Sequence, residues 1–169
     1  HVSDEILATL KAGGVDRLSM GAQSFDPNHL KTLERWHAPA TVAQAVRRAK
    51  SHGFKRINLD LIFAVPGQIM DDLDRDLDRL LELEVEHLAC YSLIFEPRTA
   101  LYNKMQLGRI SPVGEELEAA MYQHVLQRLA AAGYEQYEIS NFTRGLPSRH
   151  NLLYWHNDNW IGVGPSASS

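Results

Sequence analysis

Apolar residues follow two spacings along this chain, one typical of buried strands and the other typical of amphipathic helices. Runs of continuous or alternating apolar residues predict strands at residues 16–25, 57–68, 87–95 and 134–142. Apolar residues three or four positions apart predict helices at residues 3–12, 29–33, 41–52, 71–85 and 115–132. Strands that alternate with helices are typical of parallel βαβ units with right-handed crossovers, so we expect an α/β fold. The pattern fits an open sheet and a section of a barrel equally well.

One carboxylate interrupts the most apolar of these strands. Residues 57–68 read INLDLIFAVPGQ, and Asp60 lies within the apolar run. A strand of this composition is expected to be covered on both faces, so Asp60 must be paired or must face something polar at a strand mouth. Pro66 and Gly67 end the strand, and ligands of α/β folds bind beyond the carboxyl ends of the strands. We therefore expect the chemistry of the protein near Asp60.

Two further polar residues lie at or shortly after a predicted strand end. Gln23 stands near the end of RLSMGAQSF and offers both an amide donor and a carbonyl acceptor. Arg35 follows in the segment LERWH. Each residue alone has an ordinary interpretation, a loop-facing glutamine in one case and a surface charge in the other. Together with Asp60 they form a hydrogen-bonding set that suits a ribose or a carboxylate.

The segment RHNLLYW, residues 149–155, combines an imidazole, an amide and two large aromatic rings. Tyr154 and Trp155 suit an apolar planar ligand, and His150 or His156 can bind a metal through its imidazole. Against this, aromatic residues in loops are more often packing anchors, and a lone histidine is usually not a ligand. The tail from residue 143 onward is rich in Gly, Pro, Ser and Asn, so we predict it to be mostly loop.

Two motifs suggest a bound ion or nucleotide but do not match the corresponding patterns. The acidic run at residues 71–78 lacks the glycine and the final glutamate of a calcium loop, and its interleaved leucines predict a solvated helix face. The glycine-rich stretch at residues 162–168 lacks the lysine and the third glycine of nucleotide-binding loops, and a plain turn explains it as well as a ligand does.

The composition excludes several classes of protein. The 169 residues carry a formal net charge of −4, with neither a basic nucleic-acid surface nor an apolar run long enough to cross a membrane. Cys90 is the only cysteine, so disulfides are excluded and a cytoplasmic location is expected. One cysteine also cannot hold an iron–sulfur cluster. The first residue is His rather than Met, which indicates a fragment or a processed chain.

Taken together, the segments of this chain resemble one enzyme family. The motifs that carry the resemblance, in chain order, are RLSMGAQSF, LERWH, INLDLIFAVPGQ, CYSLIFEPRT, YEQYEISNF and RHNLLYW. Over essentially its whole length the chain resembles the oxygen-independent coproporphyrinogen III oxidase family of radical S-adenosylmethionine (SAM) enzymes. The pattern HNxxYW marks the HemW-type heme chaperone branch of that family, and residues 150–155 match it.

The resemblance implies a partial radical-SAM (β/α)6 barrel, to which this chain contributes the later parallel strands with their flanking helices. We expect residues 1–145 to form the barrel core and residues 146–169 to form a loop-rich HNxxYW segment that leads into a further C-terminal region. By position in the motifs, the residues implied to contact SAM are Gln23, Arg35, Asp60, Ile94 and Ser168. His150 is implied to contact heme.

Three residues depart from the family pattern that the resemblance implies. Glu34 and Arg98 stand where relatives usually carry glycine, and Ser168 stands where HemW-type proteins often carry histidine. The CxxxCxC loop, whose cysteines hold a 4Fe-4S cluster, does not occur in this chain, and the resemblance places it upstream. We therefore expect the chain to be enzymatically inactive by itself.

The resemblance implies part of a HemW-like protein that binds SAM and heme and delivers heme to acceptor proteins, with any membrane contact peripheral and made through those acceptors. A first alternative is an oxygen-independent coproporphyrinogen III oxidase, or dehydrogenase, of porphyrin biosynthesis. A second alternative is a non-catalytic interaction module with a decayed cofactor site. This second alternative predicts that Gln23, Arg35 and Asp60 point apart instead of sharing one site.

Overall fold

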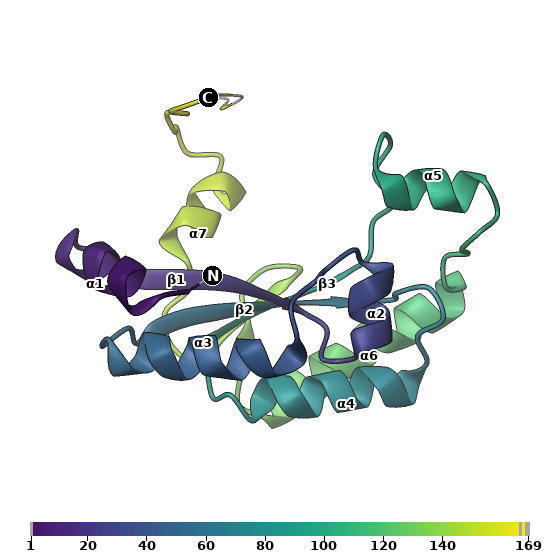
Figure 1. The fold of residues 1–169 in the computed structure, drawn as a ribbon, viewed down its shortest axis with the longest axis horizontal. Helices are drawn as coiled ribbons and strands as arrows, with labels where there is room; N and C mark the ends of the chain where they lie inside the picture. Colours follow the sequence, from purple (N-terminus) through teal and green to yellow (C-terminus); the bar gives the residue numbers. More distant parts are fainter. Residues whose placement is uncertain (1, 166, 168–169) are drawn as a thin grey trace.

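The computed structural model describes residues 2–165 and 167, and a five-stranded sheet lies at its centre (Figure 1). In chain order the strands are β1 (Arg17–Gln23), β2 (Arg56–Phe63), β3 (His87–Ser92), β4 (Glu135–Gln136) and β5 (Asn141–Thr143). Their order across the sheet is β1-β2-β3-β5-β4. The three long strands β1, β2 and β3 are parallel to one another, which confirms the predicted α/β arrangement.

The helices of the described residues are α1 (Asp4–Ala12), α2 (Pro27–Thr32), α3 (Pro39–Ser51), α4 (Met70–Leu81), α5 (Ala100–Gln106), α6 (Glu115–Ala131) and α7 (Arg149–Trp155). Figure 1 shows α3, α4 and α6 together on one side of the sheet and α7 on the other. Short polar side chains fix where the first helices begin. Ser3 Oγ accepts a hydrogen bond from Ile6 N at 3.3 Å, and Asp26 Oδ1 accepts one from Asn28 N at 2.6 Å.

The main core lies between the sheet and the helices that cover it. Alternate residues of β2 belong to one buried cluster with the helically spaced leucines of α4. These residues are Ile57, Leu59, Leu61 and Phe63 on the strand and Leu73, Leu77 and Leu80 on the helix. Successive side chains of a strand point to opposite faces, so Asn58 and Asp60 point away from this core.

The single strand predicted at residues 134–142 is a hairpin instead. β4 and β5 pair in antiparallel orientation, Glu135 with Thr143 and Gln136 with Phe142. β5 also pairs antiparallel with β3, so it runs against the three parallel strands. The alternation of apolar and polar residues continues through the turn between β4 and β5, and it therefore gave no sign that the chain reverses.

Two helices lie in segments for which the sequence pattern predicted no helix, α5 and α7. The helix at residues 149–155 corrects the expectation of a loop there. It begins at Ser148, whose Oγ accepts a hydrogen bond from Asn151 N at 3.4 Å. Neither helix buries a residue, so both lack the apolar stripe on which the prediction of helices rested.

Candidate functional site

Polar side chains gather on the face of the sheet that α3, α4 and α6 leave uncovered. Residues paired across parallel strands point to the same face, and the pairs Ser19–Asn58, Gly21–Asp60 and Asn58–His87 bring these positions together. We call this surface the open face, and its side chains include Arg17, Ser19, Asn58, Asp60, His87 and Tyr91. It is here that a polar ligand can reach the sheet.

Asp60 lies in the middle of the open face, partly buried and paired with a neighbour on its own strand. Asn58 Nδ2 donates a hydrogen bond to Asp60 Oδ1 at 2.6 Å. Burial raises the pKa of Asp60 above its ordinary value, and the hydrogen bond from Asn58 and the positive charge of Arg17 offset part of that rise. The sequence predicted that this carboxylate is paired or faces something polar. The structure provides one partner and leaves Asp60 Oδ2 with no hydrogen bond within the described residues.

Gln23 reaches the open face through an unusual backbone conformation. Its φ of 63° lies in the left-handed region, where the β1–β2 pairing is irregular. Its side-chain amide folds back into the space that a Cβ at position 21 would fill, so any residue other than glycine there would displace the amide. Because Gly21 pairs with Asp60, the Gln23 amide lies beside that carboxylate. Gln23 Oε1 is buried and has no hydrogen-bond partner, so it can accept a hydrogen bond from a ligand.

Arg35 and Ile94 line a cavity of about 300 Å³, together with Ile62 from the open face. The phenol of Tyr91 is influenced both by Arg35 of this cavity and by Asp60. Burial raises the pKa of Tyr91, the negative charge of Asp60 adds to the rise, and the positive charge of Arg35 opposes it. Asp60 and Arg35 therefore both lie within electrostatic reach of the same phenol.

The structure thus brings the predicted SAM contacts together as two neighbouring pairs. Gln23 lies beside Asp60, Arg35 and Ile94 line one cavity, and the phenol of Tyr91 is within electrostatic reach of both Asp60 and Arg35. Gln23 and Asp60 do not themselves line the cavity of Arg35. The fifth predicted contact, Ser168, lies outside the described residues.

His150 lies on α7, exposed to solvent at the end of a small aromatic group. Its ring centroid is 4.9 Å from that of Tyr154, which is in turn 4.7 Å from the ring of Trp160. An exposed imidazole can approach the iron of a heme, and the aromatic rings beside it can approach the face of that planar macrocycle. Within the described part of the chain, no group of three His, Cys, Asp or Glu side chains could hold a metal ion.

The sequence analysis missed Asn58 and Tyr91, which contact or flank the predicted site residues. Asn58 could have been found, because it stands two positions before Asp60 in the same strand and must share its face. Tyr91 carries no comparable signal, since its relation to Arg35 depends on how the loop after α2 folds back. Cys90 is fully buried, and burial raises the pKa of its thiol, in agreement with a role as a small core residue.

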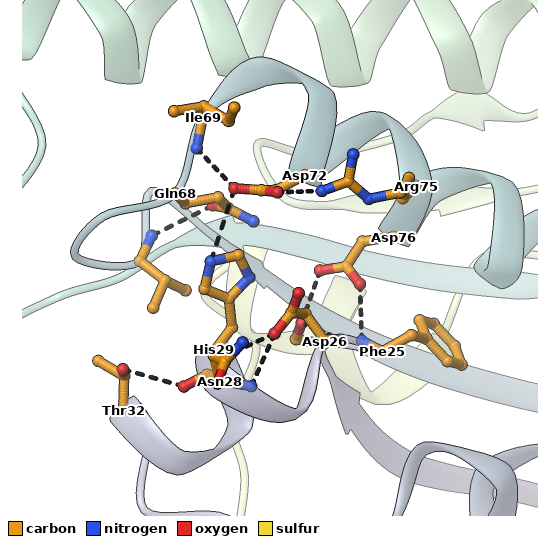
Figure 2. A network of polar contacts seen from close by, with 12 residues as sticks. Phe25, Asp26, Asn28, His29, Thr32, Gln68, Ile69, Asp72, Arg75 and Asp76 are labelled. Carbon is orange, nitrogen blue, oxygen red and sulfur yellow. Dashed lines mark hydrogen bonds and ion pairs between the residues drawn. The ribbon is translucent and has the colours of Figure 1, made fainter.

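A polar network behind the site fixes the loop that follows β1 (Figure 2). Asp76 of α4 accepts hydrogen bonds from Ser24 Oγ at 2.7 Å and from Phe25 N at 2.6 Å. Asp76 is 1% exposed, so the prediction of a solvated acidic face is wrong for this member of the run. Burial raises the pKa of Asp76, and the two hydrogen bonds oppose that rise. The network holds the segment directly after Gln23 against α4.

The loop after β2 belongs to the same region. Gln68 is buried, and its Oε1 accepts a hydrogen bond from Val65 N at 3.2 Å. His29 of α2 lies near it, with its Nε2 3.8 Å from Asp72 Oδ2 (Figure 2). The hydrogen bond of Gln68 thus closes the loop after β2 on itself, and the contact of His29 joins α2 to α4. No helix in the described ranges has the length and apolar character that crossing a membrane requires.

Comparison with known proteins gives this arrangement a context. The sequence profile of the radical SAM superfamily matches residues 1–80. The heme chaperone HemW of Bacillus subtilis strain 168 is 44% identical over 167 residues, which cover 98% of this chain and 44% of that protein. The mitochondrial radical S-adenosyl methionine domain-containing protein 1 of Danio rerio is 37% identical over 155 residues, or 91% of this chain and 35% of that protein.

Among solved structures, coproporphyrinogen III oxidase HemN from Escherichia coli, described as a radical SAM enzyme, has a TM-score of 0.77 and 22% sequence identity. The match covers 92% of this chain and 36% of that protein. This likeness confirms the fold, a partial radical SAM barrel with parallel strands and flanking helices. The chain spans 44% of the length of two curated HemW relatives that it matches.

Proposed function

This chain belongs to the radical SAM superfamily, and from that membership we propose that the complete protein containing it binds SAM at the carboxyl ends of β1 and β2. Gln23 and Asp60 would hold the ligand on the open face, and Arg35 and the backbone at Ile94 would hold it from the neighbouring cavity. Ser168 is proposed as a further backbone contact. A 4Fe-4S cluster, whose cysteine ligands this chain does not contain, would supply reducing chemistry when bound.

The observation that carries this proposal is the buried, unpartnered acceptor at Gln23 beside a carboxylate. A buried carbonyl oxygen without a donor is costly, and a bound ligand with N–H or O–H groups removes that cost. SAM carries such donors on its amino group, ribose and adenine. Asp60 accepts hydrogen bonds and adds negative charge, and Arg35 provides the complementary charge for a carboxylate.

We propose further that the complete protein is a heme chaperone, which binds heme as cargo and passes it to acceptor proteins in the cytoplasm. The support is the similarity to proteins named heme chaperone HemW, together with the exposed His150 and its aromatic neighbours on α7. Any contact with membranes would be peripheral, through the acceptors. The HemN-like fold alone does not favour coproporphyrinogen oxidation, because this fold carries different activities.

SAM binding is tested with the complete, cluster-reconstituted protein by equilibrium dialysis. We expect Asp60→Asn to raise the Kd for SAM by about tenfold, the usual effect of weakening a charged hydrogen bond. Asp16→Asn is the matched control, because Asp16 pairs with Arg56 at the opposite end of β2. An unchanged Kd in Asp60→Asn would contradict the assignment of Asp60.

Heme binding is tested by absorbance titration of the same protein. We expect His150→Ala to lose the heme-dependent absorbance band or shift its position, while His52→Ala leaves it unchanged. His52 pairs with Asp4 on the surface near α1, away from α7. Turnover of coproporphyrinogen III without stoichiometric heme uptake would instead favour the oxidase.

A further inference from the structure

A chain of hydrogen bonds crosses the open face from Asp60 to α7. Asn58 Nδ2 donates to Asp60 Oδ1 at 2.6 Å, and Asn58 Oδ1 lies 2.6 Å from His87 Nδ1. His87 Nε2 lies 2.7 Å from the hydroxyl of Tyr137, which follows β4. That hydroxyl accepts a hydrogen bond from Asn151 Nδ2 of α7 at 3.2 Å. The carboxylate is thus connected, side chain by side chain, to the helix that carries the HNxxYW motif.

The donors and acceptors of this chain fit one arrangement of protons. The two hydrogens of Asn58 Nδ2 go to Ser19 Oγ and Asp60 Oδ1, so Asn58 Oδ1 accepts from His87 Nδ1. His87 Nε2 is then unprotonated and accepts from the Tyr137 hydroxyl. From Tyr137 to Asp60, one hydrogen of each group is therefore donated towards Asp60, and the arrangement requires His87 to be neutral.

The surroundings keep His87 in that neutral form. The residue is 3% exposed, and burial lowers the pKa of His87 to about 4. The positive charges of Arg17 on β1 and of Arg56 on β2 act in the same direction. Burial also raises the pKa of the Tyr137 hydroxyl, so at neutral pH this group remains a donor. The arrangement of donors is therefore fixed across the physiological pH range.

The position of α7 depends on these contacts because the helix has little apolar packing. None of its residues is buried. The buried Ser148 precedes it, and Ser148 N donates to the Tyr137 hydroxyl at 3.4 Å. Arg56 Nη2 donates to the carbonyl of Pro147 at 3.3 Å. The Tyr137 hydroxyl is therefore a shared anchor for the start of the helix and for the residue before it.

We propose that His87 and Tyr137 are positioning residues, which hold α7 on the open face and orient Asp60 through one hydrogen-bonded chain. A change in the position of α7, the helix that carries His150, then changes the orientation of the Asp60 carboxylate, and a change at Asp60 likewise affects α7. The part of this inference that concerns SAM rests on the function proposed above. The part that concerns the position of α7 does not.

Amide hydrogen exchange in the complete protein tests the role of Tyr137. Tyr137→Phe removes the hydroxyl and keeps the ring, and we expect exchange at residues 149–157 to become about tenfold faster. Tyr134→Phe is the matched control, because the Tyr134 hydroxyl donates to Val85 O at 2.7 Å within the main core and does not contact α7. Equal effects of the two variants on α7, or no effect of Tyr137→Phe, would overturn the proposal.

A double-mutant cycle tests whether the contacts act in series. His87→Phe removes both ring nitrogens, and we expect it to accelerate exchange in α7 as Tyr137→Phe does. In the double variant the chain is already broken, so exchange should be no faster than in the stronger single variant. Effects that multiply in the double variant would show that His87 and Tyr137 act independently, against the proposal.

Added SAM tests the connection to Asp60. We expect saturating SAM to slow exchange in α7 of the unmodified protein, and Tyr137→Phe to abolish this effect and raise the Kd for SAM about fivefold. SAM binding without any change in α7 would overturn the connection. A protein that binds no SAM at all would contradict the proposed function instead, and exchange in the unliganded variants would then decide the positioning role.

Discussion

Two residues adopt backbone conformations that favour glycine, at the positions where the family resemblance leads one to expect it. Glu34 has a φ of 56° and Arg98 a φ of 74°. A side chain with a Cβ is strained in this region by about 1 kcal/mol, whereas glycine is not. The departures from the family pattern therefore have a direct physical consequence, a small loss of stability at each loop.

We expect Arg98→Gly to raise the free energy of unfolding by about 0.5–1 kcal/mol, because it removes this strain. Glu34→Gly should gain less, since it also removes the contact of Glu34 Oε1 with Lys104 Nζ at 2.6 Å. Urea unfolding of the complete protein measures both changes. A lower free energy of unfolding in Arg98→Gly would mean that the arginine side chain has a stabilising contact larger than the strain.

The lowered pKa of His87 predicts how the free energy of unfolding depends on pH. Its pKa is lowered to about 4 in the folded state, while the unfolded chain takes up the proton near pH 6.5. The unfolded state therefore binds more protons between these values, so the stability contributed by His87 is present above pH 6.5 and is lost as the pH falls towards 4. The loss should be about 2–3 kcal/mol.

Urea unfolding at a series of pH values measures this loss, and His87→Asn provides the comparison. The variant cannot titrate, so its stability should fall less steeply between pH 6.5 and pH 4. Identical slopes in the two proteins would contradict the assignment of the acid sensitivity to His87.

At the scale of elements, one buried carboxylate attaches α4 to the loop after β1. Asp76 accepts hydrogen bonds from Phe25 N (Figure 2) and from Ser24 Oγ, and Ser24 is itself 0% exposed. Removing the carboxylate leaves the buried Ser24 hydroxyl and the partly buried Phe25 amide without their acceptor. The loop that presents Gln23 to the open face would then lose its support.

We expect Asp76→Ala to lower the free energy of unfolding by about 2–4 kcal/mol, because each unpaired buried donor costs about 1–3 kcal/mol. Asp78→Ala, on the same helix, removes only an exposed ion pair with Arg128 and should cost less than about 1 kcal/mol. Thermal or urea unfolding compares the two variants. Equal losses would mean that Asp76 contributes no more than a surface charge.

Apolar spacing predicted the elements that bury a face, and it failed for those that do not. The three parallel strands and α4 each place apolar residues in the core, so their spacing indicated them. The helices α5 and α7 bury nothing, and the hairpin of β4 and β5 keeps its alternation through the turn. Local spacing carries no information on contacts made by exposed faces or on chain reversal.

The residues of the candidate site likewise fall into those that the sequence indicated and those that only the fold reveals. The carboxylate in the apolar strand marked Asp60 without any structure, and strand periodicity could have added Asn58. The placement of the Gln23 amide could not be predicted, because it depends on a positive φ and on the absence of a Cβ at Gly21. The chain from His87 to Tyr137 joins segments far apart in the sequence, whose proximity only the fold creates.

At the scale of the whole molecule, the sheet has exposed features that isolated domains usually avoid. In the sheet that the structure describes, β1 is an edge strand that pairs with β2 alone. The open face carries polar side chains and has α7 on its side of the sheet, whereas α3, α4 and α6 lie together on the opposite face (Figure 1). An unpaired parallel edge presents free N–H and C=O groups to any other strand.

We therefore predict that the 169-residue chain, produced by itself, associates with other copies through β1 or unfolds without a sharp transition. Sedimentation velocity at increasing concentration should show growing oligomers, and thermal unfolding should be broad. The complete protein is the control, since a strand or loop paired with β1 would remove the free edge. A monomeric isolated chain with one cooperative unfolding transition would contradict this prediction, and it would mean that the core beneath β2 stabilises the sheet without any partner at β1.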